Sequence, residues 1–345
     1  GYLDVERIGH LCLLDLYLIK KKIFKKKSLD FIVANSHNIC NQALYDIYKK
    51  NIKIRKNKFL KIISAAIKFY KFNEISTNFS DKDIKFAYEI PGIIKKSFNE
   101  VNKDLTKEKL ICVHNRDAAY LENIFGKSEF DYHCHRDFKF KSMEEAILNF
   151  INAGYSVVRV GNKNYDKPTL IHKNFIDYSN SYQNSSFNDL DYFSRCSAYF
   201  GSDSGIFTLA CLFQKPFSFI NFPSIDALII KYSWNRYPSI FKILIDQKTK
   251  EIIKLNDIFK YGFDKFLRKE EFDEHGILLK DNSSQDILCN SNYIIKNETT
   301  INNNITNNFV DLYLTYNKNK INLKNLNSNF VNASFLNRYY SNELR

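Results

Sequence analysis

The sequence lacks the features of a membrane span, a secretion signal and a disulfide-linked scaffold. It has no run of about 18 to 20 apolar residues, and residues 1–11 lack the basic-then-apolar layout of a signal peptide. Its seven cysteines are odd in number, dispersed and never spaced as CxxC, which argues against disulfides and against a zinc site. We therefore expect a cytoplasmic protein whose thiols are mostly buried and free.

The chain does have the length and the apolar content for a large folded core. Its 345 residues suit two domains of ordinary size, and 44% hydrophobic with 26% charged residues exclude wholesale disorder. The formal net charge of +13 is uneven, because residues 1–110 hold 23 Lys and Arg against 12 Asp and Glu. The segment Lys20–Lys71 alone has 15 basic residues and two acidic ones, a field that attracts a polyanion such as an anionic membrane surface or a nucleic acid.

Strand and helix patterns alternate along the chain, which predicts an α/β fold with parallel sheets. Ser142 and Glu145 form a capping-box pattern, and Gly154 is expected to end the helix that they begin. Residues 73–108 are polar and irregular and suit a domain boundary, whereas the asparagine-rich stretch 297–329 suits a compositional tail. The predicted strands are 3–7, 29–34, 110–114, 155–160, 198–201 and 217–221, and the predicted helices are 10–19, 39–49, 59–72, 143–153, 190–195 and 206–213.

The most specific motif is the strand-turn-helix segment with GSDSG at residues 201–205. Small residues let the backbone approach a ligand, and the free N–H groups of residues 204–207 at the helix start form an anion site suited to a nucleotide phosphate. Two alternatives stay open. The glycines can serve only a tight turn, or Asp203 can be the centre of a nucleophile elbow with His275 as its downstream partner.

Charged residues also follow or interrupt the predicted strands. Arg116 and Asp117 come directly after a strand, where an arginine points into the ligand crevice of a parallel sheet and its fork suits a phosphate. The alternative is a surface pair between these two residues. Arg159 lies inside an apolar strand and needs an anionic partner, either a phosphate or a carboxylate of the protein.

Histidines and paired aspartates give weaker signals. His10 lies at the first strand-helix turn, where an imidazole suits a general base, although a structural role is also open. His133 and His135 have no companion cluster for a metal. Asp189 and Asp191 match the DxD pattern of metal-dependent glycosyltransferases, but the pattern is common by chance and lies at a helix start. We therefore predict no metal and no cofactor.

Five segments in this order and spacing resemble bacterial glycosyltransferases of GT-B type that act in surface polysaccharide synthesis. They are RIGHL, VHNRDAAYL, AGYSVVRVG, FIDYSNSYQNSSFNDLDYF and FGSDSGIFTLACLFQKPFSFIN, and the similarity covers residues 1–295. His114-x-Arg116 is also similar to the HxR motif of GT-B fucosyltransferases, and the GSDSG turn followed by Lys215-Pro216 is similar to the donor site of heptosyltransferases. Thr208 stands where heptosyltransferases often have histidine.

The resemblance implies an α/β protein of GT-B fold, with two Rossmann-like domains that face each other across a cleft. The acceptor-side domain would be residues 1–105, the nucleotide-sugar domain residues 106–295, and the asparagine-rich tail residues 296–345. With the interpretations of the single residues above, we expect His10 or Asp117 to take the acceptor's proton. The expected donor-binding residues are Arg116, Arg159, Ser202, Asp203, Ser204 and Gly205.

The expected activity is metal-independent transfer of a sugar from a nucleotide-sugar to a glycan or lipid-linked acceptor. With the Lys20–Lys71 segment, the enzyme would work peripherally at the inner face of an anionic membrane. Rival interpretations are a sugar-nucleotide epimerase or hydrolase on the same fold, or a basic nucleic-acid-binding protein. Aromatic residues are not interleaved with the lysines in any RNA-binding signature, so no nucleic-acid partner is expected.

Overall fold

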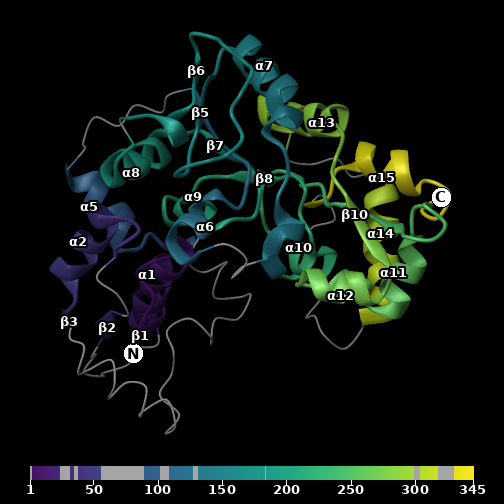
Figure 1. Ribbon diagram of the computed structural model, residues 1–345, viewed down its shortest axis with the longest axis horizontal. Helices are drawn as coiled ribbons and strands as arrows, with labels where there is room; N and C mark the ends of the chain where they lie inside the picture. The colour runs from purple at the N-terminus through teal and green to yellow at the C-terminus, as the bar shows by residue number, and fades with distance from the viewer. Residues whose placement is uncertain are drawn as a thin grey trace, which may run out of the picture. The chain divides into compact units, whose positions relative to one another are not determined.

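The computed structural model describes residues 2–23, 32–34, 38–55, 89–101, 109–126, 131–182, 184–298, 304–317 and 330–345 (Figure 1). Contacts group the chain into two compact units. Unit 1 comprises Gly1–Glu108, Tyr182–Ser197 and Ser204–Lys215, and unit 2 comprises Lys109–Ser181, Ala198–Asp203 and Pro216–Arg345. Two segments that follow residue 181 belong to unit 1, so no single boundary along the chain separates the units.

Unit 2 is built on a five-stranded parallel sheet with the strand order β6-β5-β4-β7-β8. Strands β4, β7 and β8 are buried along their whole length, as is typical of parallel strands. This doubly wound order confirms the expected α/β class with a Rossmann-like sheet. The strands are β4 (Leu110–His114), β5 (Ser156–Arg159), β6 (Phe175–Ile176), β7 (Ala198–Gly201) and β8 (Phe217–Phe219).

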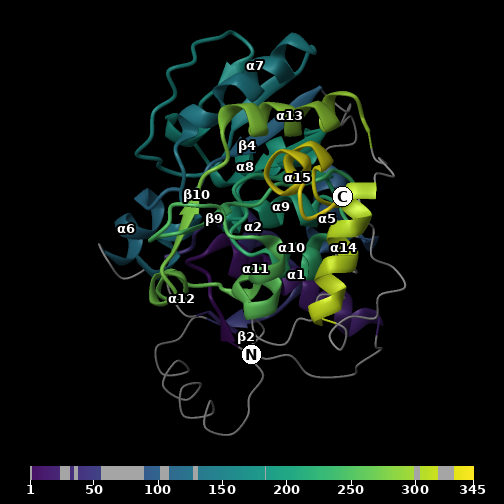
Figure 2. The ribbon, with the colours of Figure 1, turned by 90° about the vertical axis from the view of Figure 1, so that its right-hand side faces the viewer.

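Helix α7 (Glu144–Asn152) packs between the sheet and a later helix, α13 (Ser284–Ile295). The two helices lie side by side in both ribbon views (Figures 1 and 2). On the sheet side, the fully buried ring of Phe150 meets Phe200 of β7 edge-on, with the ring centroids 5.3 Å apart. The elements between β4 and α7 are α6 (Ala119–Phe125) and the 3₁₀ turns η1 (Asp131–Arg136) and η2 (Phe140–Met143).

The start of α7 differs from the predicted capping box. The Ser142 hydroxyl donates to the Lys139 carbonyl at 2.8 Å, and α7 has no side-chain cap. The neighbouring Glu144 accepts the backbone N–H groups of Thr169 at 2.6 Å and Leu170 at 3.1 Å. Glu144 at the helix start therefore binds a loop that lies far away in the sequence. The residues before it form the 3₁₀ turn η2 in place of the predicted capping box.

Residues 240–242 pair with the backbone of residues 219–222 next to β8, although they form no regular strand of the sheet. The N–H of Ile240 donates to Phe219 and that of Lys242 to Phe222, both at 2.9 Å, and a parallel bridge joins Phe222 to Phe241. This pairing brings Lys242 to the carboxyl edge of the sheet. Next come α10 (Ile225–Tyr232), β9 (Ile243–Asp246), α11 (Leu255–Tyr261), η5 (Phe263–Lys265), α12 (Lys269–Glu274) and β10 (Ile277–Lys280), which pairs antiparallel with β9; η3 (Tyr178–Asn180) follows β6.

Where it is described, the asparagine-rich region is part of the core of unit 2 and not a compositional tail. Helix α14 (Asn304–Asn317) buries Phe309, and helix α15 (Ala333–Tyr340) buries Phe335. Both rings contact the fully buried ring of Phe241, with centroids 6.1 Å and 4.9 Å away. The composition of this region did not predict its place in the core, because its few apolar residues are widely spaced among asparagines.

Unit 1 contains a three-stranded parallel sheet in the order β1-β2-β3. Its helices confirm the predicted helices near residues 10–19, 39–49, 190–195 and 206–213, whereas the predicted helix 59–72 lies outside the described residues. Strands β1 (Tyr2–Leu3), β2 (Ile32–Ala34) and β3 (Ile54–Arg55) are accompanied by α1 (Ile8–Ile23), α2 (Gln42–Asn51), α5 (Ile93–Val101), α8 (Ser186–Arg195), η4 (Gly205–Phe207) and α9 (Thr208–Leu212).

Helix α5 lies in the stretch that was expected to be irregular. A buried carboxylate on another helix caps its start, because Asp15 of α1 accepts the backbone N–H of Ile93 at 2.8 Å. Burial raises the pKa of Asp15 to about 6, and the accepted backbone hydrogen bonds oppose that rise. The start of this helix is stabilised by a cap from a residue far away in the sequence. No local sequence pattern could therefore predict it.

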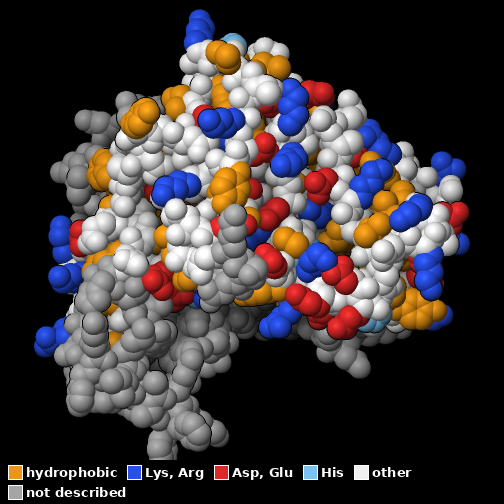
Figure 3. Space-filling view, in the orientation of Figure 1, with side chains coloured by type: hydrophobic (Ala, Val, Ile, Leu, Met, Phe, Trp, Pro, Cys, Tyr) orange, Lys and Arg blue, Asp and Glu red, His pale blue; other side chains and the backbone are white. Residues whose placement is uncertain are grey.

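Among the described helices, none is both long and apolar enough to cross a membrane. On the face drawn in Figure 3, Lys and Arg side chains of the described residues are interspersed with Asp and Glu. Most of the Lys20–Lys71 segment lies outside the described residues. Its described lysines include Lys20 to Lys22 in the last turn of α1, and Lys49 and Lys50 in the last turn of α2.

Candidate ligand site at the carboxyl edge of the parallel sheet

The strand order of unit 2 reverses between β4 and β7. From β4 the chain continues to β5 and β6 on one side, and from β7 it continues to β8 on the other. Ligands of doubly wound proteins bind outside the carboxyl ends of the strands at such a switch point. The two loops start in close contact, since the Ser202 N–H donates to the His114 carbonyl at 2.9 Å and a Cβ on Gly201 would lie 2.1 Å from that oxygen. Glycine at position 201 is therefore required by this approach.

Two arginine–aspartate pairs occupy this switch point. Arg116, in the loop after β4, donates through Nη1 to the carboxylate of Asp137 and, at 2.8 Å, to the His133 carbonyl. Arg136, at the end of η1, donates through Nη2 to the Asp203 carbonyl, and Nη2 lies 3.2 Å from the Asp203 carboxylate. The sequence predicted Arg116 and Asp203 as ligand-binding residues, and both lie at this edge.

Burial governs the electrostatics of the Arg116–Asp137 pair. Arg116 is only 8% exposed, and burial lowers its pKa while the nearby Asp137 carboxylate opposes that change. Burial raises the pKa of Asp137 against the opposing effect of Arg116. Among the described residues, the Nε of Arg136 is buried and makes no hydrogen bond. Arg116 is thus a charged group in a largely buried setting, whereas the Arg136–Asp203 pair is partly exposed, and the Arg136 Nε still has capacity for a ligand.

Lys242 adds a third cation to this edge. It is only 3% exposed, and its Nζ donates to the Asp137 carbonyl at 2.9 Å and to the Asp281 carboxylate at 2.6 Å. Lys242 and Arg136 were not predicted from the sequence as site residues. For Lys242 a signal was present, because a lysine inside the apolar run 240–245 raises the same question of a buried partner as Arg159 does.

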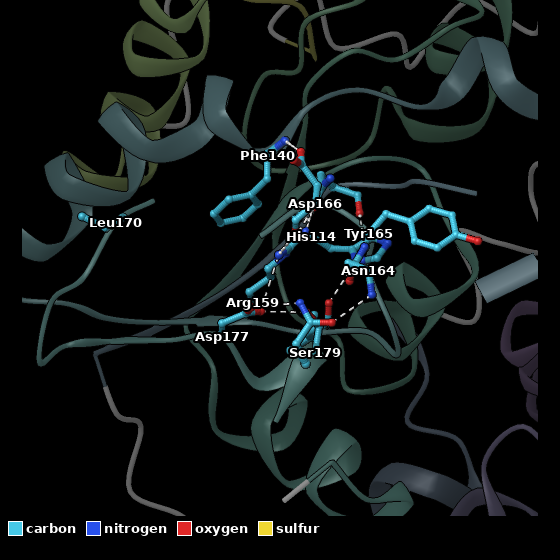
Figure 4. Close-up of polar contacts among 12 residues, drawn as sticks. His114, Phe140, Arg159, Asn164, Tyr165, Asp166, Leu170, Asp177 and Ser179 are labelled. Atoms are coloured by element: carbon cyan, nitrogen blue, oxygen red, sulfur yellow. Dashed lines mark hydrogen bonds and ion pairs between the residues drawn. The ribbon is translucent and has the colours of Figure 1, made fainter. Parts of the chain in front are cut away.

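Arg159 is fully buried, and its polar contacts are with residues of the protein (Figure 4). Its guanidinium donates to Asn115 Oδ1 at 2.8 and 3.2 Å and to the Asp166 carbonyl at 2.7 Å, and it lies 3.5 Å from the Asp177 carboxylate. It also stacks 4.1 Å above the Phe140 ring. Of the two interpretations of this residue, the geometry matches the internal pair, so we do not include Arg159 among the ligand-binding groups.

Asp117 and Ser202 also have local structural partners. The Asp117 carboxylate accepts the backbone N–H of Ala119 at 3.1 Å and that of Tyr165 at 2.8 Å, so it ties the start of α6 to a later loop. Ser202 is buried beside the His114 carbonyl. The alternative surface pair of Arg116 with Asp117 is not formed, because the Arg116 guanidinium binds Asp137 instead.

His10, Ser204 and Gly205 belong to unit 1, where the first turn of α1 packs against η4. Gly9 and Gly205 approach so closely that a Cβ on either would lie 3.1 Å from backbone of the other. The His10 Nδ1 lies 3.5 Å from Asp4 Oδ2 and 3.3 Å from Arg7 Nη2. Ser204 Oγ is buried without a hydrogen-bond partner among the described residues. The structure therefore brings the predicted base and part of the GSDSG turn into one unit.

The acidic residues of the two competing interpretations, the DxD pattern and the nucleophile elbow, have separate partners in the structure. Asp189 is buried and its Oδ2 accepts from Asn41 at 3.2 Å, whereas Asp191 pairs with Arg195 one turn later, so the DxD aspartates face different partners. The Asp203 carboxylate faces Arg136, and the ring of exposed His275 contacts the Glu271 carbonyl at 2.9 Å. Within the residues described, no group of three or more His, Cys, Asp or Glu side chains is arranged to hold a metal.

Comparison of the chain with protein-family models, curated proteins and solved structures finds no match.

Proposed function

We propose that this protein is a glycosyltransferase that binds a nucleotide-sugar at the carboxyl edge of the unit 2 sheet. The observation that carries the proposal is the buried, unpartnered Nε of Arg136 at the switch point, beside a second arginine and a buried lysine. A diphosphate offers several oxygens that can compete with Asp203 and Asp137 for these cations. The sequence resemblance to GT-B enzymes supports the same class.

In the proposed reaction, an acceptor hydroxyl attacks the anomeric carbon of the donor sugar, and the bond from that carbon to the diphosphate breaks. Arg136 and Arg116 would neutralise the negative charge that develops on the leaving diphosphate, inside an environment of low dielectric. The acceptor's proton would pass to His10, which lies beside Asp4, or to Asp117. The Asp117 carboxylate is less available, since it already accepts backbone N–H groups from Ala119, Tyr165 and Asp166.

The proposal includes the GT-B arrangement, in which unit 1 with its parallel sheet is the acceptor-side domain. It also includes metal-independent transfer to a glycan or lipid-linked acceptor, with the basic segment Lys20–Lys71 attracted to an anionic membrane. Cosedimentation with anionic but not neutral vesicles, reversed by salt, tests the membrane part. Tight binding to duplex DNA without any nucleotide binding would favour the nucleic-acid interpretation.

Calorimetric titration with a panel of nucleoside diphosphates tests the binding site. Arg136→Ala should weaken binding of the preferred diphosphate by about 1.5 to 3 kcal/mol, the range for charge-assisted hydrogen bonds. Arg236→Ala is the matched control, because Arg236 is exposed and its guanidinium donates to the Asn297 side chain. Equal affinity of wild type and Arg136→Ala, or no binding of any diphosphate, would contradict the proposal.

A further inference from the structure

Unit 2 contains a cavity of about 490 Å³ beside the arginine pairs, lined by η1, α12, β10 and the residues before β9. Figure 2 shows β9, β10 and α12 grouped together. The volume is in the range of small-molecule sites. Its charged lining is balanced, with three lysines and three aspartates: Lys242, Lys269, Lys280, Asp137, Asp273 and Asp281. Two of these lysines are already paired within the lining, Lys242 with Asp281 and Lys269 with Asp273. A balanced lining favours a neutral polar ligand over a strongly charged one.

His135 gives this cavity a directional hydrogen-bonding group. Its side chain is 8% exposed, and its Nδ1 lies 3.1 Å from the Tyr132 carbonyl. A carbonyl oxygen can only accept, so Nδ1 must carry the proton and Nε2 is left as an acceptor. Nε2 is buried and has no hydrogen-bond partner in the part of the chain that the structure describes.

The imidazole stays neutral at physiological pH. Burial lowers the pKa of His135 to about 4, and the neighbouring cations Arg136, Lys242 and Arg116 act in the same direction, against the hydrogen bond to Tyr132. Nε2 therefore remains an acceptor at pH 7. A buried acceptor without a donor is unfavourable, so a ligand hydroxyl that reaches it gains a full hydrogen bond.

We propose that this cavity receives a sugar ring, one hydroxyl of which donates to His135 Nε2. Each sugar hydroxyl both donates and accepts, which suits the adjacent Lys242 ammonium and Asp281 carboxylate. The buried Phe272 ring supplies an apolar wall for the ring face, with its centroid 5.7 Å from that of His135. The assignment rests on the proposed function only in naming the ring as part of a substrate. The ring can be the donor sugar, the donor ribose or an acceptor sugar.

Histidine-selective ¹H–¹⁵N NMR on the full chain tests this assignment directly. At pH 7 the His135 Nε2 signal should be that of an unprotonated nitrogen, and it should move when a ring occupies the cavity. The probes are free glucose, galactose and mannose, the nucleoside diphosphates, and the corresponding nucleotide-sugars. His135→Phe assigns the signal and should weaken binding of the active probe about three- to ten-fold. His275→Phe, at an exposed histidine of the same unit, should leave binding unchanged.

The three groups of probes distinguish the sources of the ring. A shift with a diphosphate alone identifies the ribose, a shift only with nucleotide-sugars identifies the donor sugar, and a shift with a free hexose identifies an acceptor sugar. Diphosphate binding that depends on Arg136 while no probe moves the His135 signal overturns the cavity assignment and leaves the proposed function intact. A hexose shift without diphosphate binding overturns the proposed function and supports the cavity assignment. A protonated Nε2 in the free protein at pH 7 overturns the assignment, even if a substituted chain fails to fold.

Discussion

The buried cations of unit 2 and two buried acids of unit 1 have different kinds of partner. In unit 2 the buried cations Arg116, Arg159 and Lys242 each lie next to a carboxylate. In unit 1 the buried carboxylates of Asp15 and Asp189 receive amide N–H groups, from the Ile93 backbone and from the Asn41 side chain. The first arrangement preserves charge in the interior. In the second, burial without a counter-cation favours the neutral, protonated acid, against the effect of the donated N–H groups.

This difference predicts different responses of the two units. Paired charges at the carboxyl edge of the unit 2 sheet can exchange a protein carboxylate for a ligand phosphate, which is a property of a binding site. Burial raises the pKa of Asp189 to about 7, so unit 1 holds a proton that its unfolded chain would release. In the proposed function unit 2 responds to ligands, and the stability of unit 1 is expected to fall as pH rises through the titration of Asp189.

The largest effect is expected where a buried cation of unit 2 is removed. Arg159→Met keeps the apolar contact with Phe140. It leaves Asp177 without its counter-cation, and Asn115 Oδ1 and the Asp166 carbonyl without the guanidinium donor. Breaking a buried pair from one side costs about 3 to 5 kcal/mol. Urea denaturation measures the loss, with Arg195→Met as the control, since its pair with Asp191 on α8 is more exposed and worth less than about 1 kcal/mol. A loss below about 1 kcal/mol for Arg159→Met would remove the contrast between the units.

A smaller, pH-dependent effect is expected from Asp189→Asn in unit 1. The folded pKa lies above the ordinary value of 3.8, so the folded state holds more protons than the unfolded state between about pH 4 and 7. Wild-type stability therefore falls as pH rises through that window, by at most about 4 kcal/mol for a shift of about three units. The asparagine variant lacks this loss and should match wild type near pH 4 but exceed it at pH 8.

Denaturation at several pH values checks this sign. Asp191→Asn on the same helix is the control, because it removes only the pair with Arg195 and should not become more stable than wild type at pH 8. If Asp189→Asn is less stable than wild type at pH 8, the carboxylate is stabilised by something other than the Asn41 amide. Burial of Asp189 would then not favour the neutral acid, and the contrast between the two units would be lost.

Local patterns predicted the elements of the unit 2 sheet well. The apolar run 110–114 and the segment 198–201 form β4 and β7 at the predicted bounds, because buried parallel strands need little beyond continuous apolar sequence. The Gly154 helix end was also predicted, and its φ of +84° explains why glycine stands there. These features depend on residues that are neighbours in the chain.

The partners of the charged residues could not be predicted in the same way. Arg116 was expected to pair with phosphate or Asp117, yet its carboxylate partner is 21 residues away at Asp137. Arg159 required an anionic partner, but nothing local indicated that Asp177 would be that partner or that the Asp166 carbonyl would accept a further hydrogen bond. The presence of a charge in an apolar strand predicts a partner, whereas the identity of that partner is set by loop packing.

The smallest effect on stability is expected at the contact between Asn41 and Asp189. Asn41 caps α2 by accepting the Leu44 N–H at 2.8 Å, while its amide donates to Asp189. Asn41→Ser keeps a good capping side chain but removes the donor that lowers the pKa of Asp189, so that pKa should rise further. Because a hydrogen bond matters more to the ionised carboxylate, we expect a loss of about 1 to 2 kcal/mol at pH 8 and a smaller one at pH 5. Asn51→Ser at the exposed end of the same helix is the control. Equal losses at both pH values would mean that the Asn41 amide serves the packing of α2 on α8 and has no part in the ionisation of Asp189.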